Sequence, residues 1–67
     1  MIYIYKKDGK ILAEIEEEDG IGFYLYIYDP ISGENTHDFL QDSLEISMEQ
    51  AEEDFSIAKS DWKLFRK

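Results

Sequence analysis

The feature that most constrains the fold is a pair of Asp-Gly dipeptides, Asp8-Gly9 and Asp19-Gly20, near the start of the chain. Asp-Gly readily adopts the positive φ angles that tight hairpin turns require. The three segments around these dipeptides, residues 1–6, 11–16 and 21–28, alternate apolar side chains with other ones, as half-buried strands do. The sequence therefore predicts a three-stranded antiparallel meander.

The turn lengths predict how these strands pair. A two-residue loop in the first turn places Ile4 opposite Ala13. In the second turn a two-residue loop would cross the two faces of the sheet, so we expect a three-residue loop over 18–20, which pairs Ile15 with Phe23. The predicted core face consists of Ile2, Ile4, Ile11, Ala13, Ile15, Phe23, Leu25 and Ile27.

One amphipathic helix is predicted after the strands. Its inward-facing side chains recur at helical spacing within an arc of about 100°. They are Leu44, Ser47, Met48, Ala51 and Phe55. We expect a helix over 43–55, but capping boxes at both 38–41 and 42–45 leave its start open.

The predicted fold class is α+β in the order β-β-β-α, an antiparallel three-stranded meander with one helix packed on one face. Residues 36–40 are compatible with a further short strand. Residues 60–65 are compatible with a short C-terminal strand or with a wrap that buries Trp62. We expect one small domain over residues 1–67, since a chain this short buries only ~60% of its unfolded surface.

Several classes of protein are excluded by composition. The chain has no cysteine, which rules out a disulfide framework, a thiolate metal site and a cysteine nucleophile. No apolar run approaches the ~20 residues that span a bilayer, and the N-terminus lacks the pattern of a signal peptide. These features predict a cytoplasmic protein.

Charge is distributed very unevenly. No lysine or arginine lies between Lys10 and Lys59, a stretch that holds 14 of the 16 acidic residues, and the net charge is −9. Because phosphate binding needs clustered cations, direct nucleic-acid binding and anionic membranes are excluded. The outer face of the predicted helix carries Asp42, Glu45, Glu49, Glu52 and Glu53. This acidic surface indicates either a basic partner or simple solubility.

All five tyrosines are predicted on the sheet face opposite the core. With one leucine they define a candidate interaction face, which consists of Tyr3, Tyr5, Leu12, Tyr24, Tyr26 and Tyr28. Aromatic clusters are typical of protein interfaces, because tyrosine buries a large area at little entropic cost. The alternative is a structural role, since tyrosine favours strands and its ring can shelter Leu12 from water.

No residue pattern indicates catalysis. His37 is the only histidine, and no serine or cysteine nucleophile stands in a motif with it. The sequence lacks a glycine-rich phosphate loop and EF-hand spacing, so we predict no catalytic residue, no metal and no cofactor. A chain this short also leaves little room for a pocket of ~300 Å³ or more.

Residues 40–62 resemble a group of small bacterial proteins of unknown function. The resemblance is carried by the stretches LQDSLE at 40–45 and QAEEDF at 50–55, and by Ser60-Asp61-Trp62. In that group a glycine follows the phenylalanine as a left-handed helix stop, where this chain has Ser56. The resemblance implies a small bacterial α+β domain and no particular activity.

The sequence thus predicts a non-enzymatic domain that binds a protein partner or forms homodimers through its tyrosine-lined face. The alternative is an acidic inhibitor of the immunity-protein, antitoxin or DNA-mimic type, which would block a basic nucleic-acid-handling protein.

Overall fold

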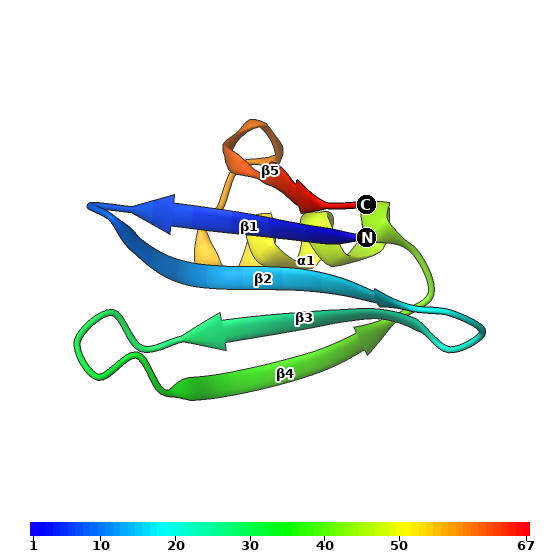
Figure 1. Cartoon of the computed structure of the whole chain (residues 1–67), viewed down its shortest axis with the longest axis horizontal. Helices are drawn as coiled ribbons and strands as arrows, with labels where there is room; N and C mark the ends of the chain where they lie inside the picture. The colour runs from blue at the N-terminus through cyan, green and yellow to red at the C-terminus, as the bar shows by residue number, and fades with distance from the viewer.

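The computed structural model describes all 67 residues as a five-stranded antiparallel sheet with one helix across one face (Figure 1). The elements are β1 (Ile2–Lys7), β2 (Lys10–Glu18), β3 (Gly22–Tyr28), β4 (Asn35–Gln41), α1 (Leu44–Phe55), the 3₁₀ turn η1 (Lys59–Asp61) and β5 (Lys63–Arg66). The strand order is β4-β3-β2-β1-β5, so the last strand pairs with the first. The α+β class is confirmed, whereas three strands was too few.

The first hairpin closes with the predicted turn. Asp8 and Gly9 have φ angles of 54° and 78°, both positive as a type I′ turn requires. Lys7 and Lys10 are the pair that flanks the turn, so the loop has two residues, as expected.

A β-bulge changes the register further along this hairpin. Leu12 has no partner, and Tyr5 pairs with Ala13 instead. Opposite residues share a face, so a one-residue shift moves every side chain of β1 beyond the bulge to the other side of the sheet. The tyrosines of β1 consequently pack against the core. The side chains whose predicted face is wrong are Ile2, Tyr3, Ile4 and Tyr5.

The second hairpin keeps its predicted faces in a different register. Its three-residue loop covers 19–21, one residue later than expected, and Gly20 is left-handed with φ 78°. Ile15 pairs with Leu25 rather than with Phe23. Because side chains alternate with a period of two, a shift of two residues leaves each one on its predicted face.

The two edge strands lie in the segments that the sequence left open. β4 pairs with β3, and β5 pairs with β1. Trp62 directly precedes β5 and is only 7% exposed, within the same buried cluster as Leu25. The C-terminal segment therefore both forms a strand and buries its tryptophan.

Helix α1 starts within the second predicted capping box, 42–45, but its N-cap is Ser43, one residue after the Asp42 that heads this box. The Ser43 Oγ accepts a hydrogen bond from the Ile46 amide at 3.1 Å, which satisfies a free N–H of the first turn. The helix ends at Ser56, which adopts a left-handed conformation with φ 59°. Glycine is the usual residue in this conformation at a helix end. The Ile57 amide then donates to the Ala51 carbonyl at 3.2 Å.

The hydrophobic core lies between α1 and the sheet. Its buried members are Ala13, Ile15, Leu25, Ile27, Ala51, Ile57 and Trp62. Ile11, predicted in the core, is 41% exposed because it precedes the bulge and pairs with the exposed Lys6.

α1 lacks the length and the apolar surface needed to cross a membrane.

Candidate functional site: the open face of the sheet

The side of the sheet away from α1 is covered by no other element (Figure 1), and we call it the open face. Cross-strand pairs arrange its side chains in rows that run from β5 to β4. One row consists of Lys63, Ile4, Glu14, Tyr26 and Asp38. The next consists of Arg66, Ile2, Glu16, Tyr24 and Leu40. The open face is thus cationic on β5, aliphatic on β1, acidic on β2 and aromatic on β3.

Tyr24, Tyr26 and Tyr28 of β3 lie on the open face beside the glutamates of β2, and we call these three tyrosines the ledge. The rings of Tyr24 and Tyr26 stack with centroids 5.9 Å apart and an interplanar angle of 14°. Burial raises the pKa of Tyr26, with Glu16 as the next cause. Burial likewise raises the pKa of Tyr28, with Glu14 next. The hydroxyls of Tyr26 and Tyr28 therefore stay protonated in the field of the two glutamates.

Glu14 and Glu16 are half-buried on the open face and have no cation beside them. Burial raises the pKa of Glu14, and the nearby charge of Glu16 raises it further. The only ion pair in the structure joins the Met1 α-amino group to Glu17 at 3.9 Å. Two carboxylates thus share one partly dehydrated strip without a counter-charge.

The raised pKa of Glu14 predicts a pH dependence of stability. Between its ordinary pKa of 4.5 and the higher folded value, the folded state binds more protons than the unfolded chain. The stability due to this carboxyl is fully present below pH 4.5 and is lost as the pH rises through the folded pKa. Glu14→Gln should therefore stabilise the protein at neutral pH and flatten this part of the profile, measured by denaturant melts across pH.

Glu52→Gln is the matched control for this prediction, because Glu52 is exposed on α1. It removes the same charge from a well-solvated position. If Glu14→Gln and Glu52→Gln change the pH profile equally, the effect comes from net charge and not from the environment of Glu14.

The structure brings together only part of the predicted interaction face. Tyr24, Tyr26 and Tyr28 share the open face, as expected. Tyr3 and Tyr5 lie on the α1 side, where the Tyr5 ring centroid is 6.4 Å from that of Trp62. The alternation of the two glutamates along β2 was visible in the sequence and could have added them to the site.

The other predicted residues lie outside the ledge. Leu12 is the half-buried bulge residue of the first hairpin. The residues of the predicted acidic surface are exposed on and just before α1, and none of them forms an ion pair. These residues are Asp42, Glu45, Glu49, Glu52 and Glu53.

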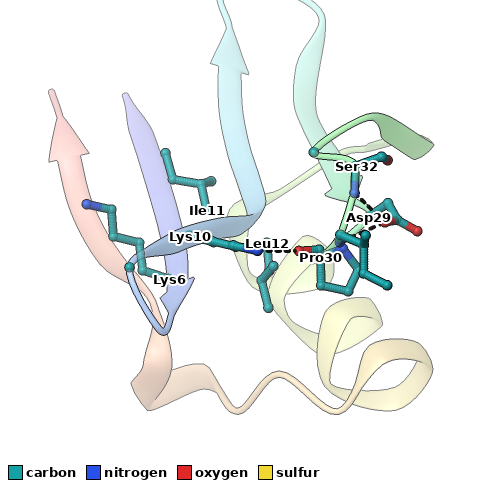
Figure 2. A pocket seen from close by; sticks show the side chains of 10 residues that line it. Lys6, Lys10, Ile11, Leu12, Asp29, Pro30 and Ser32 are labelled. Carbon is teal, nitrogen blue, oxygen red and sulfur yellow. Dashed lines mark hydrogen bonds between the residues drawn. The ribbon is translucent and has the colours of Figure 1, made fainter.

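A cavity of about 460 Å³ lies between the first hairpin and the loop after β3, larger than the length of the chain led us to expect (Figure 2). The Asp29 Oδ1 accepts hydrogen bonds from the Ser32 and Ile31 amides, both at 2.8 Å, and these bonds lower the Asp29 pKa. The Lys10 Nζ donates to the Pro30 carbonyl at 3.1 Å. These polar groups hold the loop in shape, so we place the candidate site on the open face.

No protein-family model, curated protein or solved structure matches this chain. The resemblance of residues 40–62 to small bacterial proteins stays a prediction. What the open face binds is therefore inferred from its own geometry and charge.

Proposed function

We propose that this protein is a non-enzymatic protein-binding domain whose open face binds a positively charged surface of a protein partner. The observation that carries this proposal is the strip of Glu14 and Glu16, half-buried beside stacked tyrosines and without a counter-charge. Two cations on the partner would neutralise the two carboxylates and lie against the rings of Tyr24 and Tyr26. Arginine suits this strip best, because its guanidinium both binds carboxylates in a fork and stacks on aromatic faces.

A purely structural role does not account for the strip. Glu14 and Glu16 point away from the core, so lysine or threonine would serve the fold equally well there. Two like charges in successive rows repel each other, and the partial burial of Glu14 adds a desolvation cost. A binding role explains why both positions are acidic.

A short arginine-containing peptide provides the test. We expect it to shift the backbone amide resonances of β2 and β3 in NMR titrations. The double variant Glu14→Gln/Glu16→Gln should bind it about tenfold more weakly, a loss of about 1.4 kcal/mol. The change is large because a partly dehydrated carboxylate interacts more strongly with a cation than an exposed one does.

The double variant Glu52→Gln/Glu53→Gln serves as the control, because it removes the same charge from α1. It should bind the peptide almost as well as the wild type does. Equal weakening by both double variants would mean that only the net charge attracts the peptide, and the proposal would be wrong.

The acidic inhibitor is the second candidate function. It is favoured by the exposed acids of α1, which have no ion pair and lie on the side of the molecule away from the open face. In the same titration, weaker binding by Glu52→Gln/Glu53→Gln alone would assign the interaction to α1 and favour this candidate.

A further inference from the structure

Lys63 and Arg66 lie on β5, at one edge of the open face. The acidic strip of Glu14 and Glu16 has no such cation beside it. The three-residue rows across β5, β1 and β2 are Lys63–Ile4–Glu14 and Arg66–Ile2–Glu16. A bulge at Phe65 brings Arg66 into the second row. The two cations and the two carboxylates are therefore spaced alike along the strands, on either side of β1.

Within one chain these charges do not meet. β5 and β2 are two strand spacings apart, roughly 10 Å, and the isoleucines of β1 lie between them. Neither cation forms an ion pair, and the Arg66 guanidinium lies 6.0 Å from the centre of the Phe65 ring. Both strips thus remain free to bind a second molecule.

We infer that the cationic partner of the open face is a second copy of this chain, related by a twofold axis that runs parallel to the strands above β1. This inference rests on the proposed function. Rotation about that axis exchanges the positions of β5 and β2 while each residue keeps its row. Lys63 of one copy then faces Glu14 of the other, and Arg66 faces Glu16, so that four ion pairs form.

The rest of the face suits this arrangement. Packed sheets lie about 10 Å apart, a gap that opposed lysine, arginine and glutamate side chains can bridge. The half-buried Ile2 of each copy meets its twin at the centre. Tyr24 and Tyr26 flank the incoming cations and provide ring faces for them.

The interface should be weak. Only three strands of each copy overlap. We therefore expect the interface to bury less surface than the ~1,600 Å² of a standard protein–protein interface. The net charge of −9 on each copy opposes association. We therefore expect a dimer with a dissociation constant between micromolar and millimolar.

Charge-reversal complementation tests the arrangement. Glu14→Lys alone places lysine opposite Lys63, and Lys63→Glu alone places glutamate opposite Glu14, so each variant should sediment as a monomer of about 7.9 kDa. An equimolar mixture restores opposite charges at both contacts. Its weight-average mass in sedimentation equilibrium should therefore return to the wild-type value.

Two controls change the same charges elsewhere. Glu52→Lys on α1 and Lys59→Glu in η1 should each dimerise like the wild type. Circular dichroism checks the fold of every variant, and the milder Glu14→Gln should weaken the dimer several-fold without reversing a charge.

Three results would overturn the dimer: a monomeric wild type at millimolar concentration, a dimer that Glu14→Lys leaves intact, or a mixture that fails to recover mass. If the wild type is monomeric but an arginine peptide still binds through Glu14 and Glu16, the partner is another protein and the proposed function stands. If the peptide also fails to bind, both fall.

Discussion

Leu25→Ala should largely unfold this protein. Leu25 has no exposed surface and lies between Ile15 and Phe39 on the strands at either side. Truncating a buried leucine to alanine costs about 2–5 kcal/mol, from lost burial and from the cavity left behind. A chain of this length has a total stability of only about 3–10 kcal/mol at ~0.05–0.15 kcal/mol per residue. Denaturant melts followed by circular dichroism should show little or no folded baseline.

Ile31→Ala is the control for this prediction. It removes an aliphatic side chain of similar size from a loop position that is 91% exposed. Its stability should stay within about 0.5 kcal/mol of the wild type. A Leu25→Ala protein as stable as Ile31→Ala would mean that α1 does not cover the centre of the sheet.

The local features of the fold could be predicted, because they depend on a few adjacent residues. The Asp8-Gly9 turn follows from the φ angles that the dipeptide accepts. The alternation of β3 gave the correct faces, although its register with β2 was wrong by two residues. The helix starts in one of the two predicted capping boxes, 42–45, although the cap is Ser43 and not Asp42. β4 excludes the other box by extending to Gln41.

The bulge in the first hairpin could not be predicted, because distant contacts favour it. It turns Tyr5 toward Trp62, which lies near the other end of the chain. A regular hairpin agrees with the alternation in the sequence too, because both faces of β1 are partly apolar. The sequence therefore placed the isoleucines of β1 on the α1 side of the sheet, where the structure has tyrosines, although Ile4 is buried, at 8% exposed, on the open face.

Contacts between residues far apart in the sequence also limited prediction of the site. The ledge of Tyr24, Tyr26 and Tyr28 was predicted because all three lie on one strand. The cations of β5 were missed because their place beside Ile2 and Ile4 depends on pairing between the two ends of the chain. Only that pairing shows that the open face carries both charges.

Trp62→Ala should detach β5 from the sheet. Trp62 is 7% exposed and packs in the core cluster, whereas all four residues of β5 are exposed. Trp62 is therefore the main apolar anchor of the C-terminal segment. Its truncation should weaken the attachment of β5 by about 3–5 kcal/mol, and the other strands should stay folded because β5 pairs only with β1. Phe65→Ala, a 60% exposed position on the same strand, should cost less than about 0.5 kcal/mol.

Losing β5 would leave β1 as an unprotected edge of the sheet, because the lysine and arginine side chains that guard the present edge would leave with it. Amide hydrogen exchange in β1 should therefore accelerate in Trp62→Ala, measured under conditions where β2 and β3 stay protected. The variant should also lose charge-dependent dimerisation and aggregate more readily through its new edge. Unchanged protection of β1 in Trp62→Ala would show that backbone pairing alone holds β5, and that the tryptophan is not its anchor.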